Sequence, residues 1–271
     1  MLTRSNEQIR GFTLIEMSIV LTIISLLVGG VMIGGTMLRQ TQVNSIMTDL
    51  RNYTTAMSQF QDKYGVLPGD MANATSYWGA AGSPTNTWAG CYSIVGTGTQ
   101  TCDGNGDGQI NAPGGIYAEE YRAWQHLALA GMIKGSYNGV NAKSDGTTTY
   151  DVTGTNVPKG PMDNTGYDIV YIGNNGGTAS PYTTWGPINF GHAILFGTPP
   201  GTWRSQSPAL TAIEQASLDQ KYDDGLPFSG IISMGYIGFN GSCATSPYTA
   251  ASTYNFIFQG RACSMTFVTG F

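Results

Sequence analysis

An uncharged apolar run close to the N-terminus constrains this chain more than any other feature. Between Glu16 and Arg39 lie 22 consecutive residues without a charged side chain, most of them Leu, Ile, Val, Met or Gly. A helix of this length can span the hydrocarbon core of a bilayer. The short polar segment before it carries Arg4 and Arg10, and positive residues stay on the cytoplasmic side. The run therefore predicts a single-pass anchor with the bulk of the chain outside the cytoplasm.

A cleaved secretory signal is the alternative explanation of the run. Such a signal is cut after its apolar core at small residues, and Gly34-Gly35-Thr36 could serve. However, the core of a cleaved signal is short, and this run is long. Glu16 would also place a carboxylate at membrane depth, where charge is costly and usually functional. We therefore favour a retained anchor.

The residues at the start of the run carry a specific resemblance. The segment 11–16, Gly-Phe-Thr-Leu-Ile-Glu, followed by the apolar run, resembles the processing motif of type IV pilins and type II secretion pseudopilins. The resemblance implies that prepilin peptidase cuts between Gly11 and Phe12 and methylates the new amine of Phe12. It also implies that Glu16 is the glutamate that this family uses in assembly.

Physical reasoning supports these roles. Cleavage before the run leaves the anchor attached, so the product stays in the membrane until it is assembled. Among packed apolar helices, the Phe12 amine and the Glu16 carboxylate would be unlike charges in a low dielectric, and each needs a partner. We expect a pair between neighbouring subunits to satisfy both.

Beyond Arg39 the pattern becomes amphipathic, with apolar residues three and four apart as far as Tyr64. Gly65 is a suitable C-cap and Pro68 a stop. The resemblance implies an α+β, pilin-like lollipop: a long N-terminal helix and a globular head built on an antiparallel sheet. The expected parts are a leader (1–11), the transmembrane or filament-core half of the helix (12–38), its amphipathic half (39–64) and the head (65–271).

The head is expected to contain short helices and strands. Most of 66–115 is predicted to be loop. The helical candidates are 119–133 and 209–219, the latter capped by Thr211. Stretches rich in β-branched or aromatic residues predict strands at 167–172, 192–196, 231–239, 254–258 and 264–268.

Four cysteines form two local pairs, Cys91 with Cys102 and Cys243 with Cys263. Neither pair has metal-ligand spacing, so zinc is disfavoured. Two disulfides are the simpler interpretation and indicate an oxidising compartment. The second is expected to join a C-terminal strand hairpin.

The stretch from Cys102 onward is the one candidate ligand site. Asp103, Asn105 and Asp107 alternate and are followed by Gly108, as at the start of an EF-hand calcium loop. The loop departs from that motif at its twelfth position, Gly114. We predict Ca²⁺ bound by Asp103, Asn105, Asp107, Gln109 through its carbonyl, Asn111, and either Glu119 or Glu120. A turn without an ion is the alternative, since these residues are common in turns.

Composition excludes other classes. The net charge is −5 and no Lys/Arg run occurs, so a nucleic-acid partner is not expected. No hydrolase, phosphate-binding or dinucleotide motif is present. His126 and His192 are expected to be structural, and the protein is not expected to be an enzyme.

The sequence therefore predicts a structural subunit, a minor pilin or pseudopilin, of a bacterial type IV pilus-like filament. Its expected partners are prepilin peptidase, other pilin or pseudopilin subunits and an inner-membrane assembly platform. It would lie in the inner membrane with its head in the periplasm, and later in a periplasmic or surface filament. The alternatives are a type II secretion pseudopilin and a calcium-dependent adhesin or lectin-like module mounted on a pilin helix.

Overall fold

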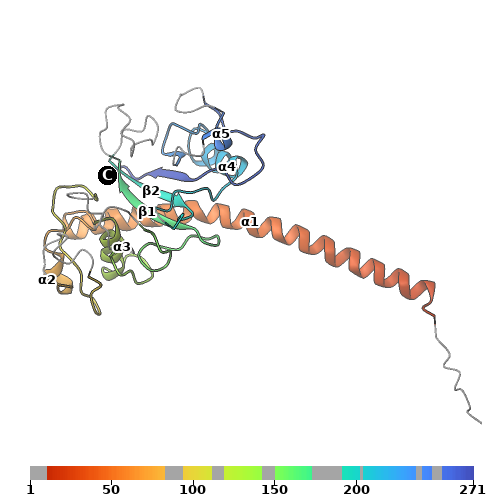
Figure 1. Ribbon diagram of the computed structural model, residues 1–271, viewed down its shortest axis with the longest axis horizontal. Helices are drawn as coiled ribbons and strands as arrows, with labels where there is room; N and C mark the ends of the chain where they lie inside the picture. The colour runs from red at the N-terminus through yellow and green to blue at the C-terminus, as the bar shows by residue number, and fades with distance from the viewer. Residues whose placement is uncertain are drawn as a thin grey trace, which may run out of the picture. The chain divides into compact units, whose positions relative to one another are not determined.

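The computed structural model describes residues 11–82, 94–111, 119–141, 150–172, 191–201, 204–235, 240–245 and 252–271. These residues form a long N-terminal helix, shorter helices and a four-stranded antiparallel sheet, which confirms the predicted α+β class (Figure 1). By its internal contacts the chain divides into two units, Met1–Gln42 and Val43–Phe271. The second unit is called the head below.

Helix α1 runs from Leu14 to Tyr64 and belongs to both units. It ends where the sequence predicts, at Gly65, which has φ of 75° and donates its N–H to the Gln61 carbonyl at 2.7 Å. Glycine adopts this left-handed conformation without strain. Within the head, one stripe of α1 is fully buried, with the half-buried Tyr53 in its middle: Val43, Ile46, Met47, Leu50, Met57 and Phe60.

The sheet contains β1 (Gly166–Tyr171), β2 (His192–Gly197), β3 (Ile232–Met234) and β4 (Met265–Val268), in the spatial order β1-β2-β4-β3. The last strand in the sequence therefore lies inside the sheet, where it pairs with both β2 and β3. The sheet contacts the buried stripe of α1. The Tyr167 hydroxyl donates to Asp49 Oδ2 at 2.8 Å, and its ring lies 5.1 Å from that of Tyr53.

The other helices are α2 (Ala74–Trp78), α3 (Glu119–Leu129), α4 (Ala212–Tyr222) and α5 (Asn240–Cys243). The predicted cap of α4 is confirmed, because Thr211 Oγ1 accepts the Glu214 N–H and Glu214 Oε2 accepts the Thr211 N–H. Helix α2 lies inside a stretch that was predicted to be loop.

The strand predicted at 254–258 is wrong. Tyr254 forms only an isolated bridge with Ala244, and the chain then turns at Phe256 and Ile257. The Ile257 N–H donates to Asn255 Oδ1 at 3.1 Å, which is an Asx turn. Of the strand predicted at 231–239, β3 covers the first part, and residues 236–239 lie outside the described residues.

Candidate functional site

The carboxylate of Glu16 caps the first turn of α1. Its Oε2 accepts hydrogen bonds from the Thr13 N–H and the Thr13 hydroxyl, both at 2.8 Å, and Thr13 Oγ1 accepts the Glu16 N–H at 3.3 Å. This reciprocal arrangement is a capping box. The Thr13-x-x-Glu16 spacing is the sequence signal of this box, but the box was not among the features predicted from the sequence.

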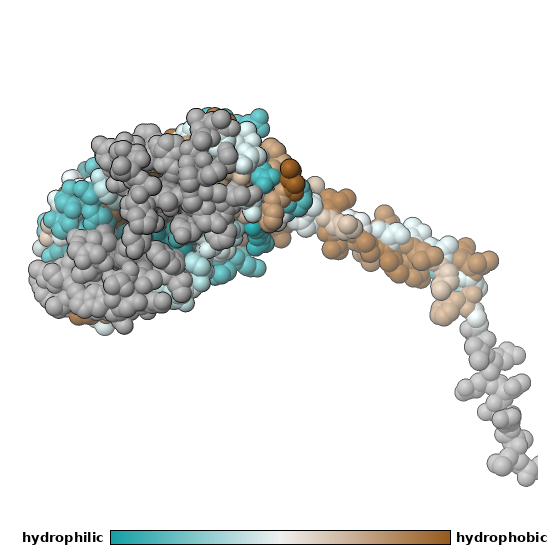
Figure 2. Space-filling view, turned by 45° about the horizontal axis from the view of Figure 1, so that its top comes forward, coloured by the Kyte–Doolittle hydropathy of each residue, from teal (hydrophilic) through white to brown (hydrophobic). Residues whose placement is uncertain are grey.

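The run that follows is apolar on every side. Its large apolar side chains are exposed from Phe12 to Leu38 and are coloured brown in Figure 2. Its few hydroxyls donate to carbonyls of the helix itself: Ser18 to Ile15, Thr22 to Ser18, Ser25 to Leu21 and Thr36 to Ile33, at 2.7–2.9 Å. Since lipid offers no hydrogen-bond partner, this pairing makes the hydroxyls compatible with a bilayer. Among the described helices, α1 is long and apolar enough to cross a membrane.

A second candidate site is the loop at 103–111, which wraps around the carboxylate of Asp70. Asp70 Oδ1 accepts the N–H groups of Gly106 and Asp107 at 2.7 and 3.0 Å, and Oδ2 accepts that of Gly108 at 2.9 Å. Gly106 and Gly108 have φ of 74° and 82°, which turns successive N–H groups inward. Asp70 was not among the predicted ligands. It lies far earlier in the sequence, and only the fold brings it here.

Three carboxylates meet at this loop. Glu119, the first residue of α3, accepts the Asn105 N–H at 3.0 Å and the Asn111 N–H at 3.2 Å. One carboxylate oxygen each from Asp70, Asp107 and Glu119 lies within 4.8 Å of the other two. The fold thus brings the predicted ligands Asp107 and Glu119 together, with Asp70 as the third acid. We call these three residues the acidic triad.

Electrostatics at the acidic triad favour a positive charge. Burial, opposed by the backbone hydrogen bonds from Asn105 and Asn111 and assisted by the charges of Asp70 and Asp107, raises the pKa of Glu119 to about 8. Burial also raises the pKa of Asp70, opposed by the N–H groups of Gly108 and Gly106. Acids that share a site resist joint ionisation. A cation held between them would relieve that repulsion.

Two predicted ligands have partners away from the acidic triad. The Asp103 carboxylate accepts the Thr75 N–H at 2.7 Å and the Thr75 hydroxyl at 3.0 Å, at the start of α2. Glu120 Oε1 forms a buried ion pair with Arg204 at 2.5 Å, and Arg204 also pairs with Asp168 at 3.1 Å. The Glu120 carboxylate therefore pairs with Arg204 in the interior of the head and does not belong to the acidic triad.

The remaining predicted ligands are amide side chains of the loop. Asn105 Nδ2 donates to Asp107 Oδ2 at 2.8 Å, and Asn111 Nδ2 donates to Gln109 Oε1 at 3.0 Å. Asn111 Oδ1 is buried and accepts no hydrogen bond. Leaving a buried polar atom without a partner costs free energy. This oxygen is therefore an acceptor available to a ligand, and it belongs to the residue whose N–H already donates to Glu119.

Both histidines hold the fold together around this loop. His126 is fully buried, and its Nδ1 accepts the Gly69 N–H at 3.0 Å, one residue before Asp70. Burial, together with the charge of Arg122, lowers the pKa of His126 to about 3, so the ring is neutral. His192 Nε2 accepts the Ile110 N–H at 2.8 Å. Each ring thus satisfies a backbone donor next to the site.

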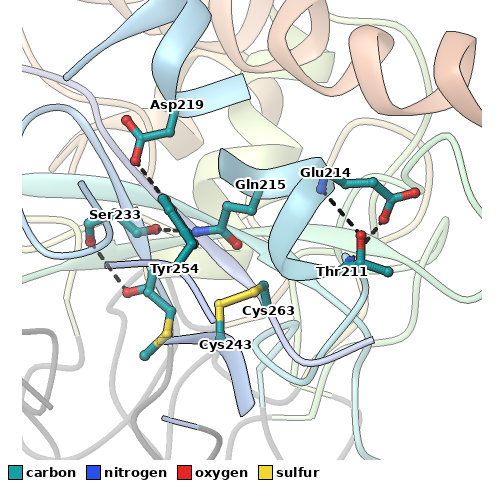
Figure 3. The surroundings of a disulfide bond; sticks show 9 residues. Thr211, Glu214, Gln215, Asp219, Ser233, Cys243, Tyr254 and Cys263 are labelled. Carbon is teal, nitrogen blue, oxygen red and sulfur yellow. Dashed lines mark hydrogen bonds between the residues drawn. A yellow bond between two sulfur atoms is a disulfide. The ribbon is translucent and has the colours of Figure 1, made fainter. Parts of the chain in front are cut away.

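The disulfide predicted between Cys243 and Cys263 is confirmed (Figure 3). Its expected context is wrong, because Cys243 lies in α5 and not in a strand. Cys263 precedes β4 and pairs with Leu210 through an isolated bridge. Cys102 is also disulfide-bonded. Its predicted partner, Cys91, lies outside the described residues.

Comparison with known families gives one match. A family model for the prokaryotic N-terminal methylation motif matches residues 8–32, which include Gly11, Phe12, Glu16 and much of the apolar run. This is the signature of type IV pilin-like and pseudopilin precursors. Neither the comparison with curated proteins nor that with solved structures gives a match.

The pilin-like motif gives the N-terminal geometry a meaning. It implies processing by prepilin peptidase and assembly with other pilin subunits. It also fits a precursor that is anchored in the membrane through α1. The capping box then belongs to the end of α1 at which processing is expected.

Proposed function

We propose that this protein is a structural subunit of a bacterial type IV pilus-like filament, either a minor pilin or a pseudopilin of a type II secretion system. The proposal rests on the methylation motif at residues 8–32. The motif covers the start of α1, whose apolar side chains are exposed as far as Leu38. The chemistry, cleavage and methylation, is performed on the chain by prepilin peptidase. The chain itself has a structural role in the filament.

Glu16 is the residue on which assembly depends in this proposal. In the isolated chain its carboxylate caps α1 through Thr13. After cleavage at Gly11, the freed amine of Phe12 lies beside the same helix end and provides a cation for the Glu16 of a neighbouring subunit. A buried ion pair that loses one partner costs about 3–5 kcal/mol. Assembly would therefore be sensitive to the charge of Glu16, beyond its role as a cap.

Two substitutions separate the charge from the cap. Glu16→Gln keeps an oxygen that can accept the Thr13 N–H but removes the charge, whereas Glu16→Ala removes both. We expect both variants to be inserted and cleaved, and both to be depleted from sheared filaments. Intact-mass measurement of membrane-extracted protein should place the mature N-terminus at Phe12. Normal incorporation of Glu16→Gln would show that only the cap matters, and a mature N-terminus beyond Thr36 would refute the filament proposal.

We also propose that the acidic triad binds Ca²⁺. Calcium takes six to eight oxygen ligands at about 2.3–2.6 Å, so ligand oxygens lie up to about 5 Å apart, and the acidic triad meets this limit. The orphaned Asn111 Oδ1 is a further oxygen of the right chemistry. Asp70, Asp107, Glu119 and Asn111 would hold the ion, with Asn105 and Gln109 shaping the loop. The ion would fasten the loop to α3.

The calcium proposal predicts a melting temperature that depends on chelator. In the detergent-solubilised full chain, Ca²⁺ should raise the melting temperature over that in EDTA, since a ligand at 100 times its Kd stabilises by about 2.7 kcal/mol. Asp107→Asn should abolish the difference. Asp103→Asn is the matched control, because its carboxylate is bonded to Thr75, and this variant should retain the difference. Equal melting temperatures of the wild type in Ca²⁺ and EDTA would mean that the loop is a turn without an ion.

A further inference from the structure

Two consecutive glutamates begin α3 and bind different partners. Both are buried, with Glu119 0% and Glu120 2% exposed. Glu119 accepts the two loop N–H groups described above, whereas Glu120 Oε1 forms the ion pair with Arg204. Consecutive Cα atoms lie only about 3.8 Å apart. A contact that fixes Glu120 therefore also limits where Glu119, a member of the acidic triad, can lie.

Arg204 ties the first turn of α3 to the sheet. It lies in the segment between β2 and α4. Its Nη2 donates to Glu120 Oε1 at 2.5 Å, and its Nη1 donates to Asp168 Oδ2 at 3.1 Å. The same Nη1 also donates to the carbonyl of Ile169 at 3.4 Å. Because Asp168 and Ile169 belong to β1, one planar guanidinium bridges α3 and β1.

The two acids cannot easily exchange Arg204 for another partner. Within the described ranges, Glu120 Oε2 and Asp168 Oδ1 are buried and have no hydrogen-bond partner. The side chains of Glu120 and Asp168 are 3% and 0% exposed, so water cannot take the place of a lost cation. Removing one partner of a buried ion pair is strongly destabilising. We therefore expect the first turn of α3 to move away from β1 when Arg204 is replaced.

The other side of the same turn packs against the residue before Asp70. A Cβ atom at Gly69 would collide with the Glu119 carbonyl oxygen, so this close approach requires a glycine. The Gly69 N–H also donates to His126 Nδ1 of α3. The backbone that carries Asp70 is therefore packed on α3. The position of the first turn then decides how closely Glu119 and Asp70 approach each other.

The later turns of α3 are held by other contacts. Thr101 Oγ1 donates to Gln125 Oε1 at 2.7 Å and lies 3.0 Å from His126 Nε2. Neither contact involves Arg204. A substitution at Arg204 is therefore expected to act on the first turn and to leave the body of the helix in place.

We propose that Arg204 is a positioning residue of the calcium site. Through Glu120 it holds the first turn of α3 where the Glu119 carboxylate meets Asp70 and Asp107. Arg204 itself does not bind the ion. The inference rests on the calcium binding proposed above, and it makes the calcium affinity of the loop depend on a contact with β1.

Calorimetric titration of the detergent-solubilised full chain with Ca²⁺ tests the proposal. Arg204→Met removes the donors and the charge, and should raise the Kd about tenfold, the lower end of the usual effect when a residue that supports a metal ligand is lost. Thr211→Ala is the matched control, because it removes the cap of α4 and weakens the head away from the loop. Its Kd should equal that of the wild type. Where Arg204→Met does not fold, Arg204→Lys takes its place, because a lysine cannot bridge two carboxylates as a planar fork.

A double-mutant cycle with Glu120→Met separates positioning from a general loss of stability. If Arg204 acts through Glu120, adding Arg204→Met to Glu120→Met should change the Kd by less than about twofold, because the contact is already broken. A full additive loss in the double variant would overturn the proposal. A wild-type Kd in Arg204→Met would overturn it too and leave the calcium site intact. No heat of binding from the wild type at millimolar Ca²⁺ would refute the calcium site and the role of Arg204 together.

Discussion

Individual buried carboxyl groups make the stability of the head depend on pH. Asp70, Glu119 and Asp219 each accept backbone N–H groups, and burial raises the pKa of each. A protonated acid is tolerated in the interior, whereas its ionised form needs a cation or several donors. These positions therefore couple the stability of the head to pH.

Asp219 gives the clearest case of that coupling. Burial, assisted by the charges of Asp224 and Asp223, raises its pKa to about 7 despite the hydrogen bond from Tyr254. A pKa above the unfolded value of about 3.9 means that its contribution to stability is complete below pH ~4 and is lost as the pH rises through about 7. We expect the melting temperature to fall from pH 5 to pH 8 and to fall less steeply in Asp219→Asn.

The control for this experiment is Asp62→Asn, which removes the same charge from an exposed position on α1. Its pH profile should run parallel to that of the wild type. Identical slopes for the wild type and Asp219→Asn would contradict the role of Asp219.

The sequence could reveal only part of the loop site. The alternation of Asp103, Asn105 and Asp107 is visible in the sequence, but it does not say which side chains converge. In the fold, Asp103 turns to α2 while Asp70 enters the loop from a distant segment. Such pairings depend on tertiary packing, so no local pattern could have selected Asp70.

At the level of elements, the ends of helices followed local rules most closely. The capping box at Thr211 sets the start of α4, and Gly65 sets the end of α1. The predicted strand at 254–258 failed because apolar, β-forming side chains were assumed to be buried in a sheet. They are instead exposed in a turn that Asn255 closes.

The cap of α4 can be tested by substitution. Thr211→Ala removes the acceptor of the Glu214 N–H and should lower the free energy of unfolding by about 1 kcal/mol, the usual cost of a lost N-cap. Thr211→Asn restores an acceptor and should recover most of that loss. Denaturant titration of the full chain measures both. An unchanged midpoint for Thr211→Ala would mean that the packing of α4 against the sheet alone sets its stability.

At the scale of the whole molecule, the two units of the chain have surfaces suited to different solvents. Residues 14–38 of α1 satisfy their own hydroxyls and expose apolar side chains, as lipid requires, while the head buries its apolar stripe against a sheet. The first unit was predictable from composition alone, because one uninterrupted run is sufficient. The order of the strands in the head was not, since short apolar segments do not specify their neighbours.

The position of β4 has a consequence for folding during synthesis. Strands β2 and β3 are synthesised before β4. They do not pair with each other, because β4 lies between them in the sheet. Until residues 265–268 have been synthesised, β2 and β3 present open edges that can pair with other strands. A premature stop codon before Met265 would remove the centre of the sheet and not its margin. The sheet therefore cannot be completed before its last strand is available.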